Sequence, residues 1–276
     1  MLGYRLLTFK EIRFLMFMKS YSSLLFVLFS ILLTASLLNA CAGSKKETEL
    51  KTQIDTDYQM AVGYYENKQT PEAIRYLALV LANDPTHAEA NHLMGFIRLG
   101  RGQYEEAVKH FKRALETKPD MLNCQNNLGA AYLHLEQYEE AAVLFKELTK
   151  SPLYTSPWLA FVNLGWAYYQ MGMTQEAIDE TETAISLNPD LCLGYNNLGI
   201  YYHSLGRDES AIKNLDEAVK LCAHYAEPHL HLGMILEAQG DTKRAIEHFN
   251  QCKNLTPKSD LGSRCAQNAD ILAKGM

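Results

Sequence analysis

The sequence predicts an all-α solenoid in which six helix–turn–helix units stack in tandem, and three regularities support this prediction. Alanines recur at intervals of 34, 34, 36, 34 and 34 residues. A small residue lies twelve positions before each alanine, and a proline lies twelve positions after four of them. A fixed period of this length is typical of stacked helical units, each of which buries its apolar face against its neighbours. The alanines are Ala73, Ala107, Ala141, Ala177, Ala211 and Ala245.

The small residues indicate how the two helices of each unit pack together. They are Ala61, Gly95, Gly129, Gly165, Gly199 and Gly233. Two antiparallel helices approach closely where such a residue faces an alanine, and large side chains at helical offsets then fill the space beside the contact. Proline ends the second helix because it cannot continue the ladder of N–H groups. Each unit is therefore predicted to consist of two helices joined by a turn.

This pattern resembles the tetratricopeptide repeat, and the resemblance covers six units over residues 54–257. It implies a right-handed superhelical solenoid. Repeat three departs from the pattern through a connection that is two residues longer and contains Ser151-Pro152 and Ser156-Pro157. Residues 258–276 trace one more amphipathic face, which we expect to form a capping helix, because an open-ended array needs a terminal cap for solubility.

The N-terminal segment, residues 1–40, has the features of a secretory signal. A basic start at Met18-Lys19 is followed by an apolar run that ends in Leu38-Asn39-Ala40-Cys41. This ending resembles the bacterial lipoprotein signal, which implies that Cys41 carries a covalent lipid such as palmitate and becomes the mature N-terminus. Residues 41–53 would then form a lipidated tether. The alternative is an uncleaved membrane anchor, because the apolar run approaches the ~20 residues of a transmembrane helix.

The residue after Cys41 bears on localisation. In the lipoprotein families that this segment resembles, aspartate at that position retains the protein at the inner membrane. Position 42 is alanine, which implies an outer-membrane lipoprotein that faces the periplasm. Several acyl chains, at about 0.8 kcal/mol per buried CH₂, would hold such a protein stably in the membrane.

Charge and motifs exclude several classes of function. The chain has a formal net charge of −6, and residues 1–40 contribute +3, which leaves −9 for the remainder. Nucleic-acid binding needs a basic surface, so this balance argues against it. The sequence contains no nucleophile elbow, phosphate-binding loop or HExxH motif. We therefore expect no catalytic residues, no metal, no small-molecule substrate and no cofactor beyond the lipid on Cys41.

Five cysteines follow Cys41, and an exported protein permits disulfides. Cys192 opens the first helix of repeat five and Cys222 closes its second, so antiparallel packing places both at the same end. Cys252 lies on the last repeat helix and Cys265 on the cap that packs against it. These positions give two candidate disulfides, Cys192–Cys222 and Cys252–Cys265, with Cys124 left free. The alternative is that all five are buried thiols, because connectivity does not follow from sequence.

The concave face is the candidate binding surface, because in tetratricopeptide repeats the first helix of each unit lines it. The groove positions that we compared contain no lysine or arginine, which disfavours recognition of a peptide's C-terminal carboxylate. They contain aromatic and apolar residues, which are typical of protein-binding hot spots, and two asparagines that could bond a partner's backbone. The alternative is that some of these side chains pack against neighbouring helices. The candidates are Tyr58, Val62, Tyr65, Phe96 and Leu99 in repeats one and two, Val162, Trp166 and Tyr169 in repeat four, and Asn126 and Asn196.

The whole layout resembles the pilotin lipoproteins of type IV pilus systems, the PilF/PilW/Tgl-like group. That resemblance implies a non-catalytic scaffold that binds secretin subunits, or another pilus assembly protein, through its concave face and promotes their assembly in the outer membrane. Two alternatives remain open. One is a lipoprotein adaptor for periplasmic cell-wall hydrolases or proteases, and the other is a subunit of outer-membrane protein assembly.

Overall fold

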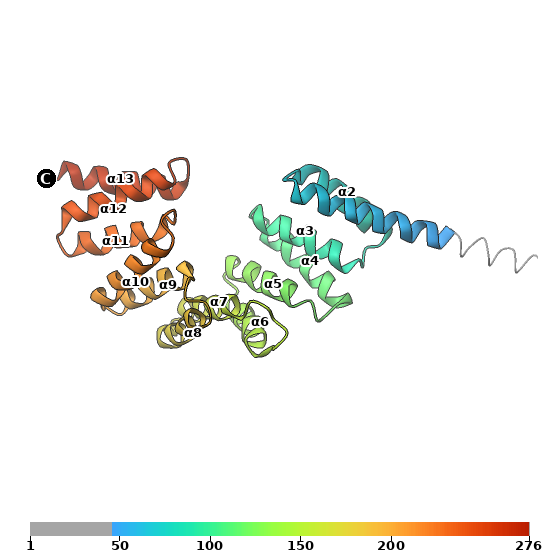
Figure 1. Ribbon diagram of the computed structural model, residues 1–276, viewed down its shortest axis with the longest axis horizontal. Coiled ribbons are helices and arrows are strands. Elements are labelled where there is room, and N and C mark those ends of the chain that lie inside the picture. Colours follow the sequence, from blue (N-terminus) through green and yellow to red (C-terminus); the bar gives the residue numbers. More distant parts are fainter. Residues whose placement is uncertain (1–45, 276) are drawn as a thin grey trace, which may run out of the picture. The chain divides into compact units, whose positions relative to one another are not determined.

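The computed structural model describes residues 46–275, so Cys41 and the predicted signal lie outside the described residues. All regular elements in this range are helices. The chain divides into two compact units, with the boundary between Pro85 and Thr86. The helices appear in chain order in Figure 1. Between residues 46 and 275, the structure contains no helix that is both long enough and apolar enough to span a membrane.

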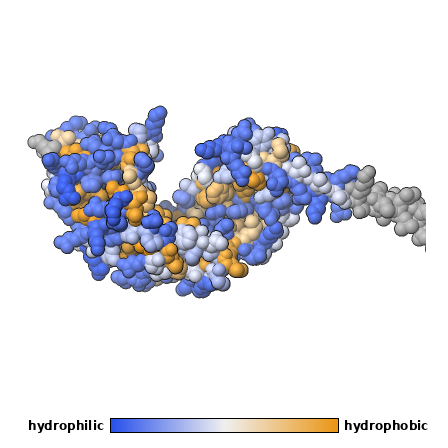
Figure 2. Space-filling view, viewed as in Figure 1, coloured by the Kyte–Doolittle hydropathy of each residue, from blue (hydrophilic) through white to orange (hydrophobic). Residues whose placement is uncertain are grey.

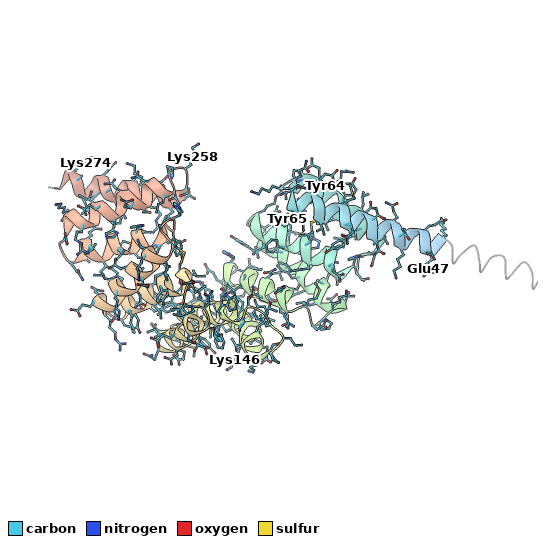
Figure 3. The ribbon with its side chains drawn as sticks, in the orientation of Figure 1. Glu47, Tyr64, Tyr65, Lys146, Lys258 and Lys274 are labelled. Atoms are coloured by element: carbon cyan, nitrogen blue, oxygen red, sulfur yellow. A yellow bond between two sulfur atoms is a disulfide. The ribbon has the colours of Figure 1, made fainter. Side chains whose placement is uncertain are left out.

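The first unit contains a helix over residues 46–66 and α2 (Thr70–Asn83). The helices pack through buried Ala61, Ala73 and Leu77. The ring of Tyr64 stacks on Tyr76 of α2, with 5.4 Å between the centroids; Tyr64 and its neighbour Tyr65 are labelled in Figure 3. Residues 46–53, part of the expected tether, are helical and continue into the first repeat helix without interruption.

The second unit consists of helix pairs followed by a final helix. Each helix packs against the next one in the chain. The odd-numbered helices α3 to α11 also contact the next helix of their own set, more extensively than any two even-numbered helices do. We call these odd-numbered helices the inner layer. The bounds are α3 (Ala88–Gly100), α4 (Tyr104–Thr117), α5 (Leu122–His134), α6 (Tyr138–Lys150), α7 (Pro157–Gln170), α8 (Thr174–Leu187), α9 (Cys192–Ser204), α10 (Asp208–Leu221), α11 (Glu227–Ala238), α12 (Thr242–Leu255) and α13 (Asp260–Lys274).

The contact between the small-residue column and the second helix sets the packing of each pair. A methyl group built on Gly95 would come within 2.7 Å of the Phe111 ring, which is shorter than any real carbon contact. The alanines of the repeat are fully buried beside these contacts. On the face of the second unit that Figure 2 shows, apolar residues appear between hydrophilic ones. The core is therefore a series of narrow interfaces between helices.

The turn between the two helices of each unit contains a residue with positive φ, and this residue recurs with the period of the repeat. A residue with positive φ occurs at positions 68, 102, 136, 172, 206 and 240, which share the spacing of the alanines. Four of these residues are glycines, which adopt this conformation without steric cost. The exceptions are Lys68, with φ 60°, and Glu136, with φ 59°. Repeats one and three therefore form the same turn at a conformational cost.

Candidate protein-binding surface

The candidate residues of repeats one and two divide between the two units. Tyr58, Val62 and Tyr65 lie half-buried on the helix over residues 46–66 of the first unit. In the second unit, Phe96 on α3 is 40% exposed, whereas Leu99 packs against the core. Phe96 is thus an exposed aromatic residue on the inner layer, and Leu99 contributes mainly to helix packing.

The candidates of repeat four lie at a cavity in the inner layer of the second unit. Its volume is about 670 Å³, within the range of ligand-binding pockets. Trp166 and Tyr169 line it. Their ring centroids lie 5.7 Å apart, and Tyr169 lies 4.7 Å from the buried ring of Tyr201, so the aromatic wall is supported from behind. The other lining residues are Ala130, Leu133 and His134 on α5, Asn163 on α7, Leu193, Asn196, Asn197 and Ile200 on α9, and Glu227 and His231 on α11.

The expectation that Val162 faces the groove is wrong. Its exposed fraction is 0%, and it does not line the cavity. Helix α7 packs against α5, α6, α8 and α9, so a side chain directed between these helices is covered. Val162 is a core residue, and it leaves Trp166 and Tyr169 as the apolar contact residues of repeat four.

The two asparagine candidates have different environments. Asn126 accepts a hydrogen bond at Oδ1 from Nδ2 of Asn163 over 3.4 Å, so it joins two inner-layer helices. In the same layer, Asn127 Nδ2 lies 3.1 Å from Nε2 of His92. Asn196 lines the cavity although it is only 2% exposed, and its Oδ1 has no hydrogen-bond partner among residues 46–275. Of the two candidate asparagines, Asn196 is therefore the one whose Oδ1 is available to accept a hydrogen bond from a partner.

Glu227 and Leu193 line the cavity, but neither was among the residues predicted to do so. Both hold the second position of their repeats when the unit is counted from Ile54, so repeat register would have identified them. Glu227 begins α11 and accepts a 2.7 Å hydrogen bond at Oε2 from the hydroxyl of Tyr225. Burial raises the pKa of that hydroxyl, so it stays protonated and keeps donating.

The electrostatics of the cavity are acidic. Glu227 is the one acidic residue among the described residues that line the cavity, and lysine and arginine do not occur among them. Burial lowers the pKa of His231, which favours its neutral form. The wall thus combines aromatic faces, amide groups and one carboxylate.

The structure joins both candidate cysteine pairs. Cys192 and Cys222 form a disulfide with their Cα atoms 6.1 Å apart, and Cys252 and Cys265 form another at 6.0 Å. The second bond ties α13 to α12. Cys124 is a buried free thiol, and burial raises its pKa to about 12, so the unreactive protonated form prevails.

Among residues 46–275, the structure contains no cluster of three or more potential metal ligands. His229 and His231, two residues apart on α11, have separate environments. Nδ1 of His229 lies 3.0 Å from Nδ1 of His248 on α12, whereas His231 lines the cavity.

Family models for the tetratricopeptide repeat match residues 55–87, 86–151, 158–191 and 190–258. The chain therefore belongs to the tetratricopeptide repeat family, and the predicted all-α repeat solenoid is confirmed. Proteins with this fold are generally non-catalytic scaffolds for protein interaction. No curated protein sequence matches the chain.

Solved structures share the fold at low sequence identity. A crystal structure of PilW, described as a widely conserved type IV pilus biogenesis factor, matches with a TM-score of 0.67 and 21% identity, covering 76% of this chain and 97% of PilW. PilF of Pseudomonas aeruginosa matches with a TM-score of 0.64 and 20% identity, covering 83% of this chain and 100% of PilF. Cut9–Hcn1 of the APC/C also matches, with a TM-score of 0.66 and 19% identity, covering 78% of this chain and 42% of the other.

Proposed function

We propose that this protein is a lipid-anchored outer-membrane scaffold that binds secretin subunits and promotes their assembly in type IV pilus biogenesis. The observation that carries the proposal is the match of its repeats to almost the whole length of PilW and PilF. The lipoprotein-like ending at Cys41 and the alanine that follows it support outer-membrane anchoring. The chain after residue 40 has an acidic net charge, so charge would not attract it to a membrane surface, and the lipid on Cys41 would provide the attachment.

The mechanism is binding without catalysis. The acyl chains on Cys41 would hold the repeat array at the periplasmic face of the outer membrane. The inner layer would then bind a segment of the secretin subunit, with the exposed Phe96 and the half-buried Trp166 and Tyr169 as anchors. A few aromatic contacts that become buried supply most of the binding energy of an interface. Holding the subunit at the membrane raises its local concentration there and favours assembly.

The functional test is deletion of the gene, followed by a heat-stable secretin oligomer assay on isolated membranes. We expect the oligomer to be lost and twitching to be abolished, and the full-length gene to restore both. Normal oligomers and normal twitching in the deletion strain would refute the secretin role.

The anchoring test is Cys41→Ala, which removes the lipidation site. We expect the variant to leave the outer-membrane fraction, whereas Cys124→Ala, a change of a buried cysteine within the repeats, serves as the matched control and stays there. Unchanged fractionation of Cys41→Ala would refute lipidation.

The binding surface is tested by Phe96→Ser and, separately, Tyr65→Ser. Each substitution removes one aromatic side chain from the first helix of its repeat. For an anchor at the centre of the interface, we expect the free energy of secretin binding to become less favourable by roughly 2 kcal/mol. Val162→Ala is not a suitable probe because that side chain is core. Unchanged binding by both variants, with circular dichroism showing intact helices, would contradict the groove assignment.

A further inference from the structure

The cavity lined by Trp166, Tyr169, Asn196 and Glu227 has a chemistry that selects its occupant. Its volume of about 670 Å³ exceeds that of one side chain, so it can hold a side chain together with part of the backbone that bears it. It lies within the second unit, and its walls come from α5, α7, α9 and α11. A segment bound there would contact four inner-layer helices at once.

The polar groups of the wall include acceptors that the protein itself does not use. Oδ1 of Asn196 is buried and has no hydrogen-bond partner among the described residues. Tyr225 donates to Oε2 of Glu227, while no donor in residues 46–275 bonds to its other oxygen, Oε1. The buried Oδ1 of Asn196 costs free energy while it has no donor, so an occupant that supplies an N–H group removes this cost on binding. Glu227 is exposed, and its carboxylate offers the occupant a negative charge and a free acceptor at the edge of the cavity.

Other classes of occupant fit less well. An anion would meet the Glu227 carboxylate with no lysine or arginine in the lining to offset it, and the lowered pKa of His231 keeps that ring neutral. A purely apolar side chain would remove the exposed Glu227 carboxylate from water and leave Oδ1 of Asn196 without a donor, which is unfavourable. The aromatic faces of Trp166 and Tyr169 attract cations.

We propose that this cavity binds an arginine side chain of the partner protein, with the guanidinium stacked on the Trp166–Tyr169 wall and its N–H groups donating to Asn196 and Glu227. Guanidinium suits the site better than ammonium because it is planar, stacks on aromatic rings and presents several donors in one plane. This inference rests on the proposed protein-binding function, and it adds the chemistry that the bound segment carries.

The test uses two synthetic peptides, acetyl-Ala-Leu-Arg-Leu-Ala-amide and the same peptide with citrulline in place of arginine. Citrulline keeps the shape of the side chain and removes its charge. Isothermal titration calorimetry should show that the arginine peptide binds about fivefold more tightly, the size expected of a cation–aromatic contact in a partly desolvated site.

Variants locate the binding in this cavity. Glu227→Gln should weaken binding of the arginine peptide about threefold, in the range of a partly exposed ion pair, and leave the citrulline peptide unchanged. Glu237→Gln, on the exposed side of the same helix and outside the cavity lining, is the matched control and should change neither. Trp166→Leu should abolish the preference for arginine while circular dichroism shows an intact fold.

Equal affinities for the two peptides, no saturable binding of the arginine peptide at millimolar concentration, or equal effects of Glu227→Gln and Glu237→Gln would overturn the inference. These outcomes are separable from the pilus role. Loss of secretin oligomers on deletion together with equal peptide affinities refutes only the arginine site. Normal secretin oligomers together with arginine-selective binding refute only the secretin role.

Discussion

Gly129 of α5 lies against the ring of Phe145 on α6, so closely that a methyl group built on the glycine would come within 2.7 Å of Cζ. The Phe145 side chain is fully buried and has little room to move aside. We expect Gly129→Ala to lower the free energy of unfolding by about 1–3 kcal/mol, the usual cost of overpacking. Urea denaturation measures this change.

Gly100→Ala is the matched control for this prediction. Gly100 ends α3, and a methyl group there would meet nothing within 4 Å. The substitution should leave stability unchanged or raise it by up to ~1 kcal/mol through helix propensity. A similar loss of stability in both variants would show that the Gly129–Phe145 contact does not limit the packing of this pair.

Glu136 occupies the turn position that is glycine in four of the six repeats, and its φ is 59°. A residue with a Cβ pays about 1–2 kcal/mol in this left-handed conformation. Glu136→Gly should therefore stabilise the protein by about 1 kcal/mol, measured as a higher urea midpoint. Glu136→Ala keeps the Cβ and should give no such gain, so equal midpoints for the two variants would contradict the argument.

The disulfides Cys192–Cys222 and Cys252–Cys265 close loops with sequence separations of 30 and 13 residues. Removing either pair by a double substitution to alanine should lower the free energy of unfolding by about 2–4 kcal/mol. Because Cys252–Cys265 holds α13 on α12, its loss should also increase hydrogen exchange in α13 before the rest of the array. Mass mapping without reduction should recover both linked peptides and a free Cys124; five free thiols would refute the pairing.

The His229–His248 pair predicts a dependence of stability on pH. Burial lowers the pKa of both imidazoles below 6.5, and the charge of His248 lowers that of His229 further. The folded state therefore binds fewer protons than the unfolded state as the pH falls through the unfolded pKa. Stability should accordingly decrease between about pH 7.5 and about pH 5.5.

Two variants isolate this contribution to the pH dependence. His248→Gln removes one titrating group of the pair, so urea midpoints at the two pH values should differ less than in the unmodified protein. His224→Gln changes an exposed histidine in the loop between α10 and α11, and it should leave the difference between the two urea midpoints unaltered. If His248→Gln retains the full pH dependence, the pair does not contribute to it.

Local features of the sequence were sufficient to predict the helix pairs of this protein. The spacing of alanines and small residues predicted the helix pairs because close helix contact at Gly129 or Gly95 tolerates no larger side chain. Antiparallel geometry within a repeat and against the cap made the two cysteine pairs candidate disulfides, with free thiols as the alternative, and the structure forms both bonds. The turn positions that include Gly102 and Glu136 recur with the same period, so repeat register also indicates where each turn lies.

The binding surface was less predictable because repeat register states which helix face a residue occupies, not what covers it. Val162 and Trp166 were both assigned to the groove, yet one is wholly buried and the other lines the cavity. The difference arises because α7 packs against both neighbouring inner helices, and the resulting overlap depends on side chains far apart in the chain.

By itself, then, the sequence determined the repeat and the class of fold, because both depend on residues spaced by fixed local rules. Only the tertiary structure decided that Trp166, Asn196 and Glu227 share one cavity, that Val162 is core and that Asn126 is bonded within the array. Those outcomes depend on how three or four helices from different repeats pack together, and burial at such a junction is a property of the assembled helices.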